Sequence, residues 1–310
     1  MQTRQLGATG PRVSVIGFGA WPIGGQMGAV ARDEAIAALQ RSIDLGSTFI
    51  DTAESYGPGR SEEIIGEAIK GRRDRVFLAT KVSGGEGHLS AASIRQACDA
   101  SLRRLQTEHI DLYQCHWVDP LTPVEESMRA MDDLVRAGKV RYVGVSNFDV
   151  ALLRRCLSVR HVDCVQPAYH LFQRDIEADL IPFCREQGIG ILAYSPLAKG
   201  VLSGKYAVDS VFAPDDERSG MKSFHGTQWR ASLERVEQLK PLAQAWGLTM
   251  SQLAIAWVLA NPAVTVVLIG AKSVQQVEEN VGAAATPLSS DQLQAIDRMV
   301  GAFRAPLSGA

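Results

Sequence analysis

The feature of this sequence that most constrains its fold is the alternation of short apolar, β-branched runs with longer segments of helical periodicity. Such alternation is typical of parallel strands joined by crossover helices. Eight strands are expected, at residues 13–17, 48–51, 76–80, 110–114, 140–145, 163–165, 189–193 and 264–267. Eight helices are expected between and after them, at residues 32–45, 61–70, 90–105, 123–137, 149–158, 174–187, 249–260 and 274–282.

Local signals support the helix boundaries and add elements at both ends of the chain. Thr122-Pro123-x-Glu125 and Thr249-x-x-Gln252 have the pattern of a capping box, the first with Pro at the first helical position. A final helix near residues 289–303 opens with Ser289-x-x-Gln292 and falls outside the eight repeats. Residues 4–13, with glycines and a proline between two short arms, predict a β-hairpin able to plug the floor of a barrel.

Eight β/α units in 310 residues match a (β/α)8 TIM barrel, which needs roughly 250 residues plus insertions. An open doubly wound sheet is the alternative, but its usual dinucleotide signature fails because Pro22 stands where the third glycine belongs. The segment from Gly200 to Lys205 likewise lacks the spacing of a Walker A loop. We therefore expect one domain over residues 1–310, an α/β (β/α)8 TIM barrel with an N-terminal β-hairpin and extra C-terminal helices.

Charge and cysteine content indicate the class of partner and the compartment. Lys and Arg number 32 against 34 for Asp and Glu, and the net charge of −2 gives no electrostatic reason to expect nucleic acid or a membrane as partner. Five scattered cysteines without a C-x-x-C pair favour a reducing compartment. No apolar signal segment opens the chain, and residues 254–271 are interrupted by Asn261 and Pro262. We expect a soluble cytoplasmic protein with a small-molecule substrate and no metal, and the sequence does not define its oligomeric state.

The carboxyl ends of the expected strands carry polar residues, and catalytic groups of a barrel come from these ends. The residues at or just after these ends are Asp51, Tyr56, Lys81, His116, Ser146, Asn147, Gln166, Tyr194 and Ser195. Each alone has an ordinary explanation: Asn147 could cap the helix near residue 149, and Tyr56 could be an exposed loop residue. A carboxylate, a phenol, an ammonium and an imidazole at one barrel mouth together favour a catalytic site.

Four of these residues have a coherent chemical use. A phenol has a pKa of about 10 and is a weak acid near neutrality, but an adjacent cation stabilises its phenolate. Lys81 can supply that cation, and Asp51 can hold Lys81 through a charge-assisted bond. His116 can donate a hydrogen bond to a substrate carbonyl oxygen. The set suits hydride addition to a carbonyl, with Tyr56 protonating the oxygen as it gains negative charge.

The sequence also resembles the aldo-keto reductase superfamily, in particular its bacterial members. The matching segments, in family order, are GFGAW at 17–21, DTAESYG at 51–57, ATK at 79–81, DLYQCHW at 111–117, GKVRYVGVSNF at 138–148, QPAY at 166–169, YSPLAKGVLSGKY at 194–206 and GAKSVQQVEEN at 270–280. The resemblance implies a catalytic tetrad of Asp51, Tyr56, Lys81 and His116. It implies NADPH-dependent reduction of aldehydes or ketones to alcohols, with hydride from nicotinamide C4 and the proton from Tyr56.

The resemblance further implies a cofactor site and a substrate pocket. Ser146, Asn147 and Gln166 would bind the nicotinamide carboxamide, Tyr194 would stack on the ring, and the Ser195–Leu202 loop would hold the pyrophosphate. The implied cofactor residues are Gly19, Ala20, Trp21, Asp51, Ser146, Asn147, Gln166, Tyr194, Ser195, Pro196, Leu197, Lys199, Gly200, Leu202, Gly270, Lys272, Ser273, Gln276, Glu279 and Asn280. The implied substrate-pocket residues are Trp21, Tyr56, His116 and Trp117.

Lys272 and Ser273 favour NADP(H) over NAD(H), since a cation at a helix N-terminus attracts a 2′-phosphate. Ser273-x-x-Gln276 is also a capping box, which could serve only to start its helix. No arginine lies between residues 265 and 287, where many relatives carry one, so NAD(H) stays possible as a second cofactor.

Two other hypotheses remain at this point. The chain could be a nicotinamide-cofactor-binding regulatory or redox-sensing subunit with little turnover, because potassium-channel beta subunits resemble the same family. It could also be a (β/α)8 enzyme of unrelated chemistry. The expected specificity loops, at residues 84–89, 117–121 and 205–229, carry no charge pattern that selects one carbonyl compound.

Overall fold

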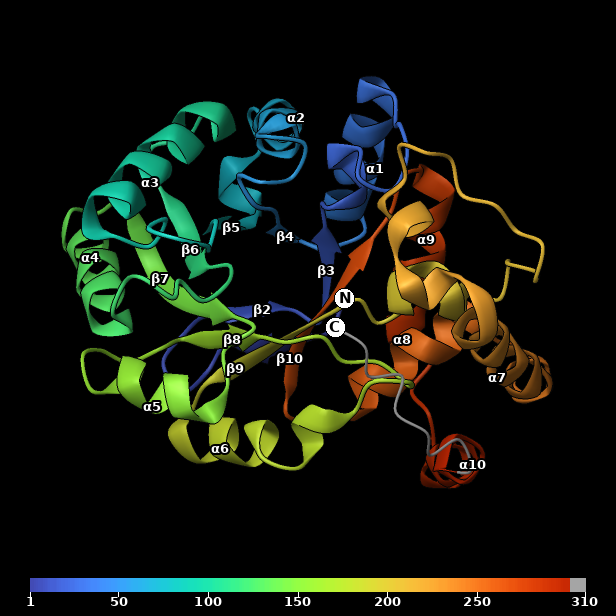
Figure 1. Cartoon of the computed structure of the whole chain (residues 1–310). Helices are drawn as coiled ribbons and strands as arrows, with labels where there is room; N and C mark the ends of the chain where they lie inside the picture. Colours follow the sequence, from blue (N-terminus) through green and yellow to red (C-terminus); the bar gives the residue numbers. More distant parts are fainter. Residues whose placement is uncertain (302–310) are drawn as a thin grey trace.

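Eight parallel strands form a closed barrel in the computed structural model, which describes residues 1–301 (Figure 1). The barrel strands are β3 (Ile16–Gly19), β4 (Phe49–Asp51), β5 (Phe77–Val82), β6 (Ile110–Cys115), β7 (Val140–Ser146), β8 (Cys164–Gln166), β9 (Gly190–Tyr194) and β10 (Val264–Gly270). They follow one another in sequence order, and β10 pairs with β3 to close the ring. The predicted (β/α)8 TIM barrel is therefore confirmed.

Helices surround the barrel on its outer side (Figure 1). The helices of the eight repeats are α1 (Arg32–Asp44), α2 (Arg60–Ala68), α3 (Ala91–Leu105), α4 (Val124–Arg136), α5 (Val150–Leu157), α6 (Leu180–Gln187), α8 (Met250–Ala260) and α9 (Val274–Gly282). Short 3₁₀ turns are η1 (Pro22–Gly24), η2 (Arg73–Arg75), η3 (Asp175–Glu177), η4 (Ala198–Ser203), η5 (Glu217–Gly220), η6 (Lys222–Phe224) and η7 (Ala283–Ala285). The helix predicted to begin at residue 174 instead begins at Leu180, because the preceding residues form η3.

Two helices lie outside the eight repeats, α7 (Gly226–Ala245) and α10 (Ser290–Gly301). The sequence argument missed α7, whose apolar positions follow the helical period weakly and whose interior contains Pro241. The predicted final helix is present as α10, and its expected residues 302 and 303 lie outside the described part of the chain. Within residues 1–301, no single helix is long and apolar enough to cross a bilayer; α7 and α8 together reach that length and composition, with an 86° bend between them.

The predicted hairpin is present as β1 (Thr3–Gln5) and β2 (Arg12–Ser14), paired antiparallel. Leu6 and Val13 are buried against apolar side chains that fill the barrel interior, so the hairpin seals the barrel floor. Arg4 adds hydrogen bonds to the carbonyls of Leu259, Asn261 and Val264, near the end of α8. The first barrel strand was wrongly placed at residues 13–17, because Val13 belongs to β2 and the barrel strand begins at Ile16.

The capping patterns at Thr249 and Ser289 form the expected hydrogen bonds, and the pattern at Thr122 does not. Thr249 and Gln252 form both reciprocal hydrogen bonds at the start of α8. Ser289 and Gln292 do the same before α10, at 2.8 and 3.3 Å. The capping box at Thr122 is wrong: α4 begins at Val124, and the Thr122 hydroxyl donates to Asp119 instead, at 2.7 Å.

Candidate active site

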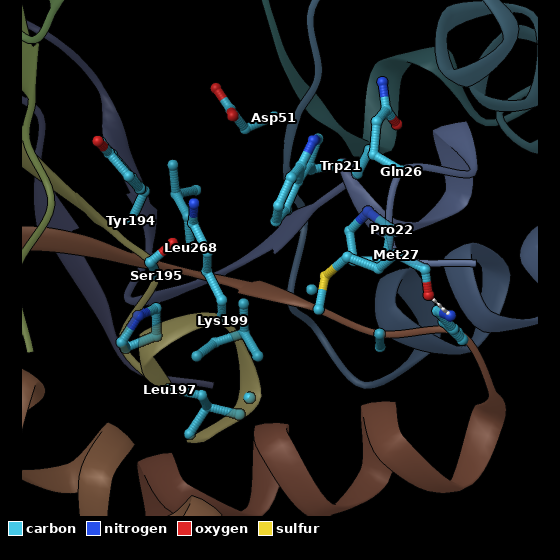
Figure 2. Close-up of a pocket in the computed structure, with 18 of the residues that line it drawn as sticks. Trp21, Pro22, Gln26, Met27, Asp51, Tyr194, Ser195, Leu197, Lys199 and Leu268 are labelled. Carbon is cyan, nitrogen blue, oxygen red and sulfur yellow. Dashed lines mark hydrogen bonds between the residues drawn. The ribbon is translucent and has the colours of Figure 1, made fainter. Parts of the chain in front are cut away.

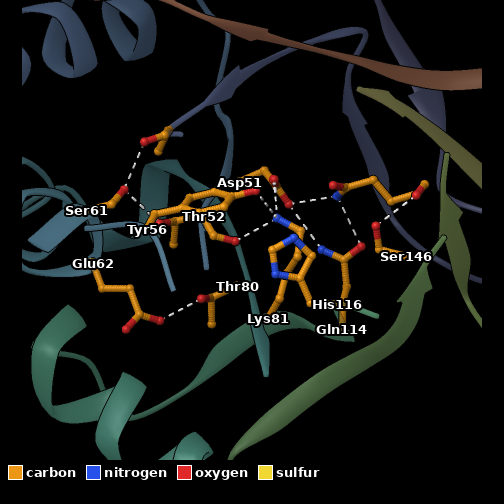
Figure 3. Close-up of polar contacts among 12 residues, drawn as sticks. Asp51, Thr52, Tyr56, Ser61, Glu62, Thr80, Lys81, Gln114, His116 and Ser146 are labelled. Carbon is orange, nitrogen blue, oxygen red and sulfur yellow. Dashed lines mark hydrogen bonds and ion pairs between the residues drawn. The ribbon is translucent and has the colours of Figure 1, made fainter. Parts of the chain in front are cut away.

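A buried ammonium lies at the centre of the barrel mouth. Lys81 on β5 is fully buried, and its Nζ donates to Asp51 Oδ1 at 2.6 Å, the Thr52 carbonyl at 2.8 Å and Tyr56 Oη at 3.3 Å (Figure 3). An ammonium has three donors, and all three are used here. The ion pair that the sequence predicted between Asp51 and Lys81 is therefore present, with the Tyr56 hydroxyl on its third donor.

Two glutamines bind the second oxygen of Asp51. Gln114 Nε2 and Gln166 Nε2 donate to Asp51 Oδ2 at 3.1 and 2.9 Å, and Gln166 also donates to Gln114 Oε1 at 3.2 Å (Figure 3). Sequence reasoning placed Gln166 at the site but missed Gln114. The signal was available, because Gln114 lies two positions after Leu112, which faces the barrel interior, and alternate residues of a strand face the same side.

The loop that carries Tyr56 is fixed at both ends by tight contacts. Thr52 Oγ1 donates to Ser61 Oγ at 2.8 Å, which ties the end of β4 to the first turn of α2. Gly57, at φ +59°, has no room for a side chain, since a Cβ there would lie 2.1 Å from the Gly24 carbonyl oxygen. The phenol is thus held in place by the backbone around it.

Burial and charge set the protonation states of the site. Burial raises the pKa of Tyr56, and the opposing effect of Lys81 only partly offsets it, so the phenol stays protonated near neutral pH. Burial lowers the pKa of Lys81, but Asp51 and Tyr56 outweigh that effect and the pKa is raised. The pKa of His116 is lowered to about 3 by burial and by the charge of Lys81, so the imidazole is neutral at neutral pH. Its ring meets the Tyr56 ring edge-on, with centroids 5.7 Å apart.

The ends of β7, β8 and β9 form a second polar group beside the first. Asn147 Nδ2 donates to the His116 carbonyl at 3.2 Å, and Asn147 Oδ1 accepts from Tyr194 Oη at 2.9 Å. Ser146 Oγ donates to the Gln166 carbonyl at 2.9 Å. Asn147 has a left-handed backbone, φ +61°, and is not the helix cap, since Asp149 caps α5. The alternative reading of Asn147 as a cap is therefore wrong.

A cavity of about 630 Å³ extends from these groups toward the start of α9 (Figure 2). Its predicted lining residues are Gly19, Ala20, Trp21, Asp51, Tyr56, His116, Trp117, Ser146, Asn147, Gln166, Tyr194, Ser195, Pro196, Leu197, Lys199, Gly200, Gly270, Lys272, Gln276, Glu279 and Asn280. Lys81 lies buried behind the lining. Leu202 and Ser273 do not line it: Leu202 is buried and its N–H bonds the Leu197 carbonyl, and Ser273 Oγ accepts from the Gln276 N–H.

Further residues that were not individually predicted also line the cavity, several of them in the expected specificity loop at residues 205–229. They are Pro22, Gln26, Met27, Ser55, Ser203, Lys205, Tyr206, Glu217, Arg218, Ser251, Leu268, Ile269 and Ala271. Several belong to residues 205–225, which we call the strap. Met27 forms a β-bridge with Asp216, and the Glu217 N–H bonds the Gln26 carbonyl at 2.9 Å, so the strap contacts the loop after β3 across the cavity.

Aromatic packing and an ion pair hold the strap. Arg218 pairs with Asp216 at 2.5 Å and donates to Tyr206 Oη at 2.6 Å. The same guanidinium stacks 4.4 Å from the Phe212 ring centroid, and Phe212 packs against Trp229 of α7. The unpredicted helix α7 therefore anchors the strap.

Cations gather at the end of the cavity beside α9. Lys272 Nζ donates to the carbonyls of Met27 and Gly28, and burial together with Arg218 lowers its pKa. The Lys272 N–H bonds Gln276 Oε1 at 2.8 Å, so only half of the predicted Ser273–Gln276 capping box forms. Lys199, Lys205, Arg218 and Lys272 all line the same cavity. The arrangement suits a polyanionic ligand.

Comparisons with known proteins agree with this geometry. The model of the Aldo/keto reductase family matches residues 15–300. The aldo-keto reductase YhdN of Bacillus subtilis (strain 168) is 39% identical over 288 residues, 90% of this chain and 87% of the relative. A probable voltage-gated potassium channel subunit beta of Oryza sativa subsp. japonica is 37% identical, covering 96% of each chain. A Klebsiella pneumoniae aldo/keto reductase solved with NADP and acetate superposes with a TM-score of 0.77 at 34% identity, covering 100% of this chain and 98% of the other.

Proposed function

The chain belongs to the aldo/keto reductase family and is an oxidoreductase that uses NADP(H), and from this premise we propose that it reduces aldehydes or ketones to alcohols with Tyr56 as the proton donor. The observation that carries this proposal is the buried Asp51–Lys81–Tyr56 chain, with His116 beside it at the cavity wall. Bound NADPH would supply a hydride to the carbonyl carbon.

The residues of the cavity fit that cofactor. The amide of Asn147 and the phenol of Tyr194 lie at the strand ends, where a nicotinamide ring can be held by hydrogen bonds and by an aromatic face. Gln26 Oε1 is buried at the cavity wall and, within the part of the chain described, has no hydrogen-bond partner, so it is free to accept one from a ligand. The cations at the α9 end would neutralise the phosphates.

We propose that Arg218 supplies the arginine that the stretch around α9 lacks. Arg218 and Lys272 both line the cavity, and Arg218, although paired with Asp216, contributes to lowering the pKa of Lys272, so the two cations lie at one end of the cavity. A 2′-phosphate placed there would meet two cations, whereas the 2′-hydroxyl of NAD would not use them. This arrangement supports a preference for NADP(H), with NAD(H) as a weaker second cofactor.

The protonation states support the proposed acid chemistry. Tyr56 is protonated near neutral pH, so it has a proton to give, and Lys81 stabilises the phenolate that remains. Asp51 keeps Lys81 charged and aimed at the phenol oxygen. Neutral His116 can donate one hydrogen bond to the carbonyl oxygen without competing for the proton.

The proposal is tested by following absorbance at the NADPH band with a panel of aldehydes, ketones and sugars, using NADPH and NADH in parallel. Repeated turnover with at least one carbonyl compound, faster with NADPH, is the expected result. Tight NADPH binding with almost no turnover across the panel would contradict it and favour the regulatory, redox-sensing alternative.

We also propose a cytoplasmic location and a small-molecule carbonyl compound as the substrate. All five cysteines are free and buried thiols, which fits a reducing compartment. Cell fractionation with an antibody against the chain checks the location, and recovery of the chain outside the cytoplasmic fraction would contradict it.

A further inference from the structure

One buried carboxylate at the barrel mouth has no part in the chemistry above. Asp119, which is 5% exposed, lies in the loop between β6 and α4. Its Oδ1 accepts from the N–H groups of Gly87 and Leu121, at 3.0 and 2.9 Å. Its Oδ2 accepts from the Leu89 N–H at 2.9 Å and the Thr122 hydroxyl at 2.7 Å. Two of these four donors belong to a different loop, the one between β5 and α3.

The two loops that Asp119 joins are those that follow Lys81 and His116 along the chain. They also touch directly, since a Cβ on Gly84 would lie 2.4 Å from the Trp117 carbonyl oxygen and 2.5 Å from its Cβ. Trp117 lines the cavity and stacks on His116, with ring centroids 6.0 Å apart. The position of the Trp117 indole beside the proposed proton donor therefore depends on the hydrogen bonds and packing that hold these two loops together.

The group that joins the two loops is the charged carboxylate of Asp119. Burial alone would raise the pKa of Asp119, but the Thr122 hydroxyl and the three N–H groups lower it to about 2. The carboxylate is thus ionised throughout the physiological range. Each of its four bonds is charge-assisted, and such bonds are shorter and stronger than bonds between neutral groups.

The loop that carries Asp119 presents exposed apolar side chains, one of which lies at the cavity. Trp117, Val118 and Leu121 are 51%, 39% and 67% exposed, and all three lie within two residues of Asp119. Of these, Trp117 lines the cavity itself. An indole held at the cavity wall can bury much apolar surface against a flat or extended apolar group of a substrate. It can bury little against a small hydroxylated substrate.

We propose that Asp119 is a positioning residue that fixes Trp117 and thereby favours carbonyl compounds with an aromatic or long apolar substituent. The inference rests on the proposed function, since it concerns which substrates that reaction accepts. It assigns no role in proton transfer to Asp119, whose effect passes through the loop and the indole.

The first test compares Asp119→Asn with wild type on two substrates, an aromatic aldehyde and glyceraldehyde. Asparagine keeps the volume but turns an NH₂ group toward two of the four donors, so the loops lose part of their fastening. We expect the KM for the aromatic aldehyde to rise about tenfold, as for loss of one charge-assisted hydrogen bond, while kcat for both substrates and the KM for glyceraldehyde change less than about twofold.

A matched control separates positioning from general loss of stability. Asp163, 6% exposed, also accepts a backbone N–H, from Val143 at 2.8 Å, but it precedes β8 at the opposite end of the barrel. Asp163→Asn should leave both KM values unchanged. If it raised the KM for the aromatic aldehyde as much as Asp119→Asn does, the positioning role would be wrong.

A second route moves Trp117 without touching Asp119. Gly84→Ala should displace the Trp117 backbone and raise the KM for the same aromatic aldehyde, even if Asp119→Asn proves too unstable to assay. In a double-mutant cycle with Trp117→Ala, Asp119→Asn should add almost nothing once the indole is gone. Additive effects would overturn the inference.

A readout without catalysis keeps the two proposals distinguishable. Acrylamide quenching of Trp117, obtained by subtracting the Trp117→Phe background, should increase in Asp119→Asn and stay unchanged in Asp163→Asn. If wild type reduces no carbonyl compound yet the quenching responds as expected, the proposed function fails and the loop fastening stands. If wild type is active and neither quenching nor KM responds, the inference about Asp119 fails alone.

Discussion

The two ends of the cavity are built in different ways. At the Tyr56 end, side chains from the ends of neighbouring strands form one hydrogen-bonded group around Asp51 and Lys81, and the barrel fixes their positions. At the α9 end, Lys272 and Arg218 line the same cavity because the strap reaches the loop after β3 through the Met27–Asp216 bridge. Asp51 and Lys81 are thus fixed by strands of the barrel, whereas Arg218 is brought to the cavity by a long segment outside the barrel strands.

Lys81→Met should have the largest effect on the hydrogen-bonded group around Asp51 at the Tyr56 end of the cavity. It removes the cation from Tyr56 and leaves Asp51 buried without its partner, so we expect a loss of about 3–5 kcal/mol in the free energy of unfolding. Reductase turnover should fall by at least the roughly 10²–10⁴-fold that a general acid contributes. Denaturant unfolding and steady-state kinetics measure the two losses. A stable variant with normal turnover would show that Lys81 does not act on Tyr56.

Tyr56→Phe tests the same group without disturbing the ion pair. The ring and its packing remain while the hydroxyl that Lys81 contacts at 3.3 Å is lost. We expect turnover to fall roughly 10²–10⁴-fold with NADPH affinity nearly unchanged. Tryptophan fluorescence quenching gives the affinity, and a substrate limited by the chemical step gives the rate. Wild-type turnover in such an assay would rule out Tyr56 as the proton donor.

Lys272→Ala and Arg218→Met test the α9 end of the cavity. The expected losses here are in cofactor affinity and are smaller. Losing one charge-assisted phosphate contact should weaken NADPH binding by roughly fivefold to a hundredfold. NADH should be affected far less. Lys272 also bonds the Met27 and Gly28 carbonyls, so its loss loosens that loop as well. If either variant lost the same factor in affinity for NADPH and for NADH, the substituted residue would not be the one that binds the 2′-phosphate.

The smallest expected effect is on the pH dependence of activity, through the protonation state of His116. Its pKa in the folded chain is about 3, well below the usual 6.5, so protons bind the unfolded chain more readily. The contribution of neutral His116 to stability is complete above pH 6.5 and declines as the pH falls toward 3. We expect no break in kcat/KM from His116 between about pH 5 and 8. A break in that window that disappears in His116→Gln would contradict the assignment of a neutral imidazole.

The contrast between the two ends also explains what could be predicted from the sequence. Asp51, Lys81 and His116 follow apolar runs directly, so counting strands was enough to place them at one mouth. Gln114 was missed although it closes the strand expected at residues 110–114, because His116 was taken as the polar residue at that strand end. Its inward direction becomes evident only from the alternation along β6.

Arg218 could not be predicted in the same way. It lies far in sequence from Lys272, in a segment without clear periodicity, and its place at the same cavity depends on Met27 bridging Asp216. The helix that anchors this segment, α7, was itself missed because Pro241 and a weak apolar stripe conceal it. The displaced start of β3 has another cause, since Val13, Val15 and Ile16 lie close together in sequence although Val13 belongs to the hairpin and Ile16 to the barrel.

The hairpin and the β3–β10 seam set an order of events during synthesis of the chain. Arg4 bonds carbonyls at residues 259, 261 and 264, and Ile16 pairs with Val267, so the hairpin and β3 are made well before the segments they bind. Until β10 emerges, the nascent sheet keeps two open edges that can pair with other chains. Barrel closure therefore has to wait for β10, and a chain cut short before β10 would keep both edges open permanently.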